Sequence, residues 1–138
     1  MTMVFASGEL PSRDVLVRLY DSVGWSAYTA DPDLLEAAMA VSLRVTTARV
    51  DGHLVGLARV VGDGLTIVYL QDILVNPAHH RSGIGRRLLD EVLAPYASVR
   101  QKVLLTDTEP AQRAFYEATG FVEAHDHQPG LRAFVRFD

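Results

Sequence analysis

The most informative segment of the chain is Ile73-Leu74-Val75-Asn76-Pro77-Ala78-His79-His80-Arg81-Ser82-Gly83-Ile84-Gly85-Arg86-Arg87-Leu88-Leu89. It reads as an apolar strand, a polar turn with two glycines one residue apart, and an amphipathic helix. The first N–H groups of a helix lack partners within it and carry the positive end of its dipole, and glycines let a ligand approach the bare backbone. The segment therefore predicts an anion site for a diphosphate, with Arg81, Arg86 and Arg87 as added positive charge.

Two glycines alone are equally well explained by a strand-to-helix turn in which they only satisfy backbone geometry. Other nucleotide-binding motifs fit this turn less well. The chain has no Gly-Lys-Ser/Thr sequence, which a P-loop requires. A dinucleotide fingerprint needs three glycines and a later acidic residue, whereas this turn has two glycines and follows strands that we expect to be antiparallel.

The composition is that of an ordinary globular protein. The 138 residues fit a single domain, 1–138, with 49% hydrophobic and 22% charged residues. A formal net charge of −4 argues against a broad basic face for nucleic acid. The absence of cysteine excludes disulfides, thiolate metal sites and a cysteine nucleophile. Neither a signal peptide nor a membrane span of about 18 apolar residues is present, so we expect a cytoplasmic protein without a membrane partner.

Hydrophobic periodicity predicts an α/β fold with a mixed sheet, in the order β-α-α-β-β-β-α-β-α-β-β. Three consecutive strands joined by tight turns form an antiparallel meander, and the glycine-containing segment leads through a helix into a parallel strand. The predicted strands are Met3–Ser7, Leu43–Val50, Leu54–Val61, Leu65–Val75, Lys102–Thr106, Phe121–Glu123 and Leu131–Phe137. The predicted helices follow Pro11, Asp31 and Gly83 and cover Ala111–Thr119, with a break over Gly24–Ala30.

The glycine turn resembles the acetyl-CoA motif of the GNAT superfamily of N-acyltransferases, Arg/Gln-x-x-Gly-x-Gly/Ala after a Val-x-Pro strand end. Here His80-Arg81-Ser82-Gly83-Ile84-Gly85 occupies the motif, with Val75 and Pro77 before it. The departure is His80, where the family has Gln or Arg. A second similarity is Phe115-Tyr116 followed by Gly120-Phe121, on the helix after the next strand. On its own, this second pattern is also typical of core packing.

The resemblance implies direct transfer of an acetyl group from acetyl-CoA to a primary amine of a small molecule, without a metal. It implies that Tyr116 is the general acid for the departing thiolate, since a phenol can donate to developing negative charge. It also implies that Phe115 packs along the pantetheine arm and that Thr108 stands where relatives carry Asn. The cofactor-binding residues implied are Ile73, Leu74, Val75, His80, Arg81, Ser82, Gly83, Ile84, Gly85, Arg86, Thr108 and Phe115.

The general base is left open by the sequence. Asp72 is the one carboxylate on the strand before the glycine turn, and it is either the base or a structural carboxylate that pairs nearby. Strict alternation puts Tyr69, Gln71, Ile73 and Val75 on one face and Leu70, Asp72 and Leu74 on the other, unless a bulge redirects them. A water relay anchored by Tyr69 or Gln71 is an equal alternative.

The acceptor amine is expected to meet the connection between the first two helices and the strand opposite the cofactor. The candidate residues are Trp25, Tyr28, Tyr69 and Gln71, with Arg59 as a further one. Aromatic residues there also serve simply to cover a core. The alternatives to a small-molecule enzyme are a protein or peptide N-acetyltransferase and a non-catalytic acyl-CoA-binding module. Relatives dimerise through late strands, for which Leu131–Phe137 is the candidate, and His125 and His127 have no spacing that supports a metal site.

Overall fold

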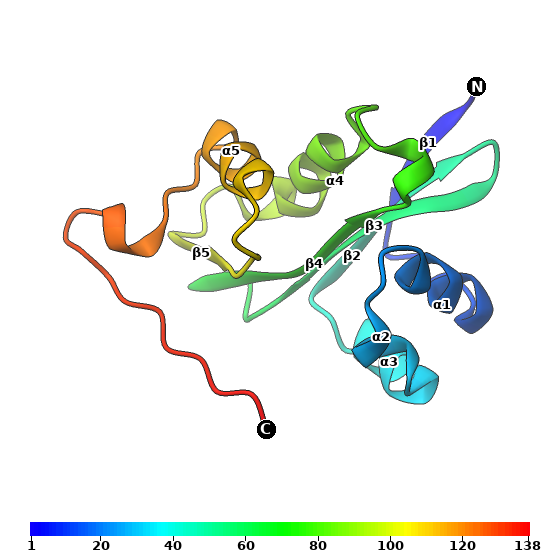
Figure 1. The fold of residues 1–138 in the computed structure, drawn as a ribbon, viewed down its shortest axis with the longest axis horizontal. Coiled ribbons are helices and arrows are strands. Elements are labelled where there is room, and N and C mark those ends of the chain that lie inside the picture. Colours follow the sequence, from blue (N-terminus) through cyan, green and yellow to red (C-terminus); the bar gives the residue numbers. More distant parts are fainter. The chain divides into compact units, whose positions relative to one another are not determined.

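A computed structural model describes residues 1–138, and the chain forms two compact units, Met1–Leu105 and Thr106–Asp138 (Figure 1). The first contains β1 (Met3–Ser7), α1 (Arg13–Ser22), α2 (Ser26–Thr29), α3 (Pro32–Ala40), β2 (Arg44–Val50), β3 (His53–Val61), β4 (Ile67–Val75), η1 (Pro77–His79), α4 (Ile84–Leu93), η2 (Ala94–Tyr96) and β5 (Gln101–Leu104). The second contains α5 (Pro110–Ala118) and η3 (Ala124–Asp126).

The sheet of the first unit has five strands in the order β1-β2-β3-β4-β5. The first four strands pair antiparallel with their neighbours in sequence, and β5 pairs parallel with β4. A parallel neighbour needs a crossover connection, and α4 supplies it. The predicted α/β fold class with a mixed sheet is thus confirmed, together with the meander and the strand–helix–strand segment.

Local signals explain the hairpin and the start of the third helix. Asp51 and Gly52 both have positive φ angles, 49° and 84°, as the two-residue turn between β2 and β3 requires. Asp31 caps α3 by accepting a hydrogen bond from the Leu34 N–H at 3.2 Å, and Pro32 occupies the first turn. The segment expected only as a break, Gly24–Ala30, contains the short helix α2.

The pairing of β3 with β4 contains a β-bulge. Arg59 pairs with Asp72, but the next residue, Val60, pairs with Leu70, so Gln71 is an extra residue in β4. Successive residues of β3 point to opposite faces, and each strand residue shares its face with its partner. Leu70 and Asp72 therefore lie on opposite faces of the sheet, although they are two residues apart.

The bulge corrects the strict alternation predicted for β4. Tyr69 pairs with Val61, which shares a face with Arg59, so Tyr69 lies on the Asp72 face. The prediction that Tyr69 shares a face with Ile73 is therefore wrong, because the extra residue reverses the alternation. One face of β4 carries Tyr69, Asp72 and Leu74, and the other carries Leu70, Ile73 and Val75.

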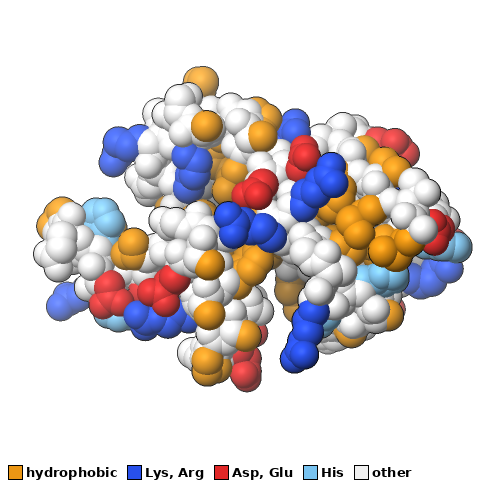
Figure 2. Space-filling model, turned by 90° about the horizontal axis from the view of Figure 1, so that it is seen from above, with side chains coloured by type: hydrophobic (Ala, Val, Ile, Leu, Met, Phe, Trp, Pro, Cys, Tyr) orange, Lys and Arg blue, Asp and Glu red, His pale blue; other side chains and the backbone are white.

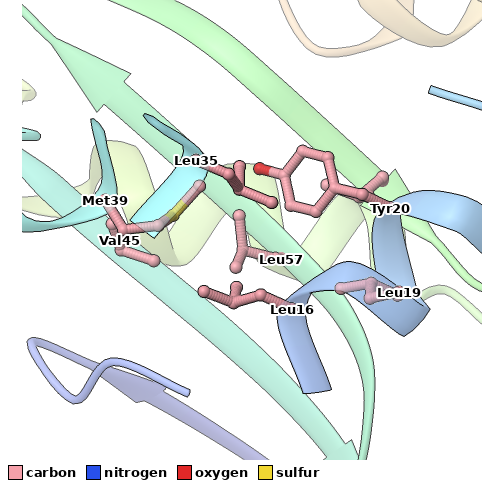
Figure 3. Close-up of a cluster of buried hydrophobic side chains, with 8 residues drawn as sticks. Leu16, Leu19, Tyr20, Leu35, Met39, Val45 and Leu57 are labelled. Carbon is pink, nitrogen blue, oxygen red and sulfur yellow. The ribbon is translucent and has the colours of Figure 1, made fainter. Parts of the chain in front are cut away.

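Helices α1 and α3 cover the face of the sheet that carries Leu57, the partner of Leu74 (Figure 3). Burying a leucine-sized side chain contributes roughly 1.5–3 kcal/mol, so this cluster is a main source of stability in the first unit. Its members are Leu16, Leu19 and Tyr20 from α1, Leu35 and Met39 from α3, and Val45, Leu57 and Leu74 from the strands.

Helix α4 packs closely against the other face of the sheet. Its buried side chains include Ile84, Leu88, Leu89 and Val92. A Cβ atom added to Gly56 on β3 would lie 2.9 Å from Leu88 Cδ1, which is closer than carbon atoms pack. Glycine at this position therefore lets the helix that follows the glycine turn approach the sheet.

The two closing strands predicted at Phe121–Glu123 and Leu131–Phe137 are not formed. Alternating apolar residues indicate only that a segment can be a strand, and a strand also needs a partner for its backbone groups. In the second unit the Leu131 N–H donates to the Ala124 carbonyl, and Phe134 and Phe137 are 88% and 86% exposed.

No helix is both long and apolar enough to cross a membrane. On the face drawn in Figure 2, Lys and Arg side chains lie in separate groups among acidic and apolar ones.

We predict that the β3–β4 turn makes stability sensitive to acid through Asp63. Its carboxylate accepts hydrogen bonds from Thr66 Oγ1 and from the N–H groups of Leu65, Thr66 and Ile67, which together lower the pKa of Asp63. A lowered folded-state pKa stabilises the fold above the unfolded-state pKa of about 4, and this contribution is lost as the pH falls below it. Asp63→Ala should therefore lower the urea midpoint at pH 7, and the deficit should shrink at pH 2.5.

The control for this measurement is Asp21→Ala, which removes an exposed carboxylate from the last turn of α1. It should change the midpoint little at either pH. A deficit for Asp63→Ala that is equally large at pH 7 and pH 2.5 would contradict the prediction.

Candidate functional site

The start of α4 is open to an anionic ligand. Gly83 precedes the helix in the left-handed conformation, with φ of 81°, and no side chain caps the first turn. The N–H groups of Ile84, Gly85 and Arg86 therefore lack intrahelical partners. Arg81 also has a positive φ, 63°, which is uncommon for a residue with a side chain. The predicted diphosphate-binding turn thus has the backbone geometry of an anion site.

The loop between β4 and α4 is braced by its own polar groups. The Asn76 N–H donates to the Val55 carbonyl at 2.8 Å, and the Asn76 side chain accepts from the Ala78 N–H at 3.0 Å. His80 Nε2 lies 2.9 Å from the Val75 carbonyl, and the Ser82 hydroxyl donates to the His79 carbonyl. His80 and Ser82 thereby hold the loop shape that presents the backbone of Gly83.

The basic side chains near the turn differ in their contacts. Arg87 lies over the ring of Phe5 at 4.2 Å and 3.7 Å from Glu91. Arg86 lies 3.6 Å from Asp90 and is 55% exposed. Such exposed ion pairs are weak, so Arg86 can turn toward a ligand at little cost. Arg81 is exposed at the turn itself.

Beyond Leu70, no strand pairs with β4 on its β5 side, because the pairing ends at Leu70 and Leu104. Since the Asn76 N–H points to β3 and peptide groups alternate along a strand, Ile73 and Val75 direct their N–H groups to the free side. Leu74 is buried in the core and its backbone pairs with Leu57. The predicted cofactor residues Ile73 and Val75 thus line the free edge, whereas Leu74 faces away from it.

Asp72 is the centre of a buried polar network. Its carboxylate is 2% exposed and accepts a hydrogen bond from Tyr20 Oη at 2.9 Å and one from Tyr28 Oη at 2.7 Å. Arg59 Nε donates to the same carboxylate at 2.8 Å and forms an ion pair with it. These contacts agree with the alternative prediction for Asp72, namely that it is a structural carboxylate paired with neighbouring groups.

The network raises the pKa of two tyrosines and of one arginine, Tyr20, Tyr28 and Arg59. Burial first, and then the charge of Asp72, raise the pKa of Tyr20 well above its usual range. Burial and the hydrogen bond to Asp72 also raise the pKa of Tyr28. Burial opposes the charge of Arg59, but the attraction of Asp72 outweighs it and raises the pKa of Arg59. At neutral pH both phenols are therefore neutral and Arg59 is charged.

The structure places two of the predicted acceptor residues, Tyr28 and Gln71, in direct contact beside Asp72. Gln71 Nε2 donates to Tyr28 Oη at 3.1 Å, and the Trp25 ring lies 6.1 Å from the Tyr28 ring between centroids. Burial and the charge of Asp72 raise the pKa of Tyr69, which lies on the Asp72 face. Tyr28 and Gln71 thus lie in contact at the start of the free edge of β4, with Trp25 against Tyr28 and Tyr69 on the Asp72 face.

Sequence reasoning missed Tyr20 as a partner of Asp72 and Arg59 as its counter-charge. A signal was present, because a phenol on an apolar helix face and a carboxylate in an apolar strand each need a buried partner. The sequence does not say which pairs with which. Across residues 1–138, no group of three or more His, Asp or Glu side chains is arranged to hold a metal ion.

Tyr116 is enclosed by aromatic side chains of the second unit. It is 8% exposed and packs edge-on against Phe115 and Phe121, with ring centroids 5.0 Å and 5.9 Å away. Burial first, and then the nearby carboxylate of Asp107, raise the pKa of Tyr116 to about 12. Tyr116 is therefore a neutral hydroxyl donor at any physiological pH. Thr108 is exposed at the start of this unit.

Comparison with known proteins gives a match to the model of the "Acetyltransferase (GNAT) domain" over residues 42–123. Mycothiol acetyltransferase of Clavibacter sepedonicus is 44% identical over 55 residues, which are 40% of this chain and 18% of that protein. Serotonin N-acetyltransferase 2 of Oryza sativa subsp. japonica is 28% identical over 102 residues, which are 74% of this chain and 50% of that protein. The chain thus spans half or less of the length of these two relatives.

Among solved structures, a GNAT family acetyltransferase of Streptococcus pneumoniae TIGR4 has a TM-score of 0.86 and 29% identity, covering 99% of this chain and 98% of that one. Two others share the fold. An aminoglycoside N-acetyltransferase in complex with CoA has a TM-score of 0.69 at 20% identity, covering 99% and 95%. Ribosomal-protein-alanine N-acetyltransferase of Brucella melitensis biovar Abortus 2308 has a TM-score of 0.73 at 22% identity, covering 99% and 100%.

We predict that the ion pair between Arg59 and Asp72 is essential for stability. Asp72→Asn leaves the guanidinium of Arg59 buried without its counter-charge, and removing one partner of a buried pair costs about 3–5 kcal/mol. Urea unfolding measures this loss. The control is Arg13→Gln, which removes exposed pairs with Asp33 and Glu36 and should shift the midpoint far less. Equal shifts for the two variants would contradict the assigned role.

Proposed function

The chain belongs to the GNAT acetyltransferase family, and on that premise we propose that it transfers an acetyl group from acetyl-CoA to a primary amine of a small molecule. The proposal rests on two neighbouring features. They are the uncapped start of α4 after Gly83 and the free edge of β4, the strand that leads into this turn. A ligand with a diphosphate and a long polar arm fits this combination of a backbone anion site and unpaired strand N–H groups.

In the proposed complex, the backbone of the turn binds the diphosphate of the co-substrate. The N–H groups of Ile84, Gly85 and Arg86 donate to the phosphate oxygens, and Arg81 adds charge. The free N–H groups of Ile73 and Val75 bind the arm and donate to the thioester oxygen as it gains negative charge. Gln71 lies about 13 Å along the strand from Val75, since a strand rises about 3.3 Å per residue.

The proposed reaction is a direct displacement. The amine nitrogen forms a C–N bond to the acetyl carbon, the C–S bond breaks, the nitrogen releases one proton to water, and the departing sulfur takes one proton from Tyr116, which solvent then restores. Tyr116 donates its hydroxyl hydrogen bond to the sulfur as charge develops there. Direct proton abstraction by Asp72 remains a prediction, and its three donors favour the anchoring role because they already occupy both carboxylate oxygens.

A small-molecule acceptor is supported by the names of several similar proteins, which refer to mycothiol, serotonin and aminoglycosides. A protein acceptor is the second candidate, because an acetyltransferase of the same fold is named for acting on a ribosomal protein. A place in the cytoplasm and assembly into a homodimer remain predictions of the sequence. Release of CoA thiol with a panel of primary amines tests the acceptor class.

We predict that Gly83→Asp weakens acetyl-CoA binding. The substitution adds a Cβ at a φ of 81° and places a carboxylate before the helix start, where it repels phosphate and caps the N–H groups. Calorimetric titration should show at least about a tenfold weaker affinity, which corresponds to about 1.4 kcal/mol. The control is Gly52→Asp, in the β2–β3 turn, where φ is 84° and the space is equally open. Equal affinity in both variants would overturn the cofactor site.

We predict that Tyr116→Phe lowers kcat by about a hundredfold, as expected for a lost general acid, while acetyl-CoA affinity stays within a few-fold. Because the pKa of Tyr116 is about 12, the wild-type phenol stays protonated, and no loss of rate from its ionisation should occur below pH 10. The measurement is the pH–rate profile of thiol release, with binding titrated separately. A variant with unchanged kcat would remove Tyr116 from the chemistry and leave it as core packing.

A further inference from the structure

Tyr28 holds a half-buried hydroxyl at the point where the free edge of β4 begins. Its oxygen donates to Asp72 Oδ1 at 2.7 Å and accepts from Gln71 Nε2 at 3.1 Å. Gln71 is the extra residue of the bulge, directly after the last residue of β4 that pairs with β5. A phenol oxygen has acceptor capacity beyond a single bond, so the Tyr28 oxygen can accept one more donor.

The carboxylate behind Tyr28 is closed to a ligand. Asp72 is 2% exposed, and its Oδ2 accepts from both Tyr20 and Arg59. Tyr28 is therefore the outermost member of the network, and a group approaching from the free edge meets its hydroxyl before it meets the carboxylate. Donation to a charged acceptor also polarises the phenol oxygen and makes it a stronger acceptor.

We propose that Tyr28 receives the acceptor amine, with its oxygen accepting a hydrogen bond from the amine N–H. This inference rests on the proposed acetyl transfer. Because the hydrogen of Tyr28 is committed to Asp72, the hydroxyl offers only an acceptor, so it selects a donor such as a primary amine. Asp72 and Arg59 are then positioning residues that hold the phenol so that the amine lone pair points along the strand toward the acetyl carbonyl.

Tyr20 provides a matched control. Its hydroxyl donates to the other oxygen of the same carboxylate at 2.9 Å, but the residue is 0% exposed and cannot touch a substrate. Tyr20→Phe and Tyr28→Phe therefore each remove one donor from Asp72 and keep the ring. Only Tyr28→Phe also removes the oxygen that is proposed to meet the amine.

The test compares wild type, Tyr20→Phe and Tyr28→Phe with propylamine, 2-phenylethylamine and spermidine as acceptors. For the best acceptor, Tyr28→Phe should lower kcat/KM for the amine by about tenfold or more, as expected for a lost hydrogen bond, and leave acetyl-CoA affinity within a few-fold. Tyr20→Phe should lower kcat/KM by less than about threefold, even if urea unfolding shows that it loses more stability. Equal effects of the two variants, or an unchanged Tyr28→Phe enzyme, would overturn the assignment to Tyr28.

A binding measurement separates this inference from the proposed function. Calorimetric titration of the same amines into the CoA-saturated proteins needs no turnover. If wild type releases no thiol, the proposed function fails, but amine binding that Tyr28→Phe loses and Tyr20→Phe keeps still supports the role of Tyr28. Equal binding by the two variants, or no binding of any amine to wild type, overturns it.

Discussion

Residues from three different elements donate hydrogen bonds to the carboxylate of Asp72. Tyr20 of α1, Tyr28 of α2 and Arg59 of β3 all donate to it. An isolated buried carboxylate would cost several kcal/mol, so these three bonds are what permits the charge inside the first unit. In return, the charge fixes a short helix of four residues that buries none of its own side chains. The position of Tyr28 therefore depends both on its hydrogen bond to Asp72 and on packing against the core of the first unit.

The β-bulge at Gln71 gives the network its position. Without the extra residue, Tyr69 would turn to the α4 face, away from Asp72. The same residue marks where β4 loses its parallel neighbour and exposes the N–H groups of Ile73 and Val75. A single irregularity thus sets the orientation of Tyr69 and marks the start of the strand edge that is proposed to bind the co-substrate.

The features that follow from neighbouring residues could be predicted from the sequence. The glycine turn, the cap at Asp31 and the Asp51-Gly52 hairpin each depend on residues within one turn of the chain. The partners of Asp72 are 13, 44 and 52 residues away, so local patterns do not identify them. The strand predicted at Leu131–Phe137 is absent for the same reason. Alternating apolar residues are a local pattern, whereas a strand forms only where a second strand pairs with it.

The same difference between local and distant contacts distinguishes the two halves of the proposed site, the co-substrate half and the acceptor half. The turn and the free edge of β4 lie within residues 42–123, which match the family model, whereas Tyr20, Trp25 and Tyr28 precede that region. Backbone N–H groups bind a diphosphate whatever the neighbouring side chains are, so a short motif suffices to specify that half. In the proposed site, acceptor choice depends on the side chains around Asp72, of which Tyr20 and Tyr28 lie outside the region that the family model matches. Family membership therefore identifies the co-substrate, while the acceptor has to be inferred from the network around Asp72.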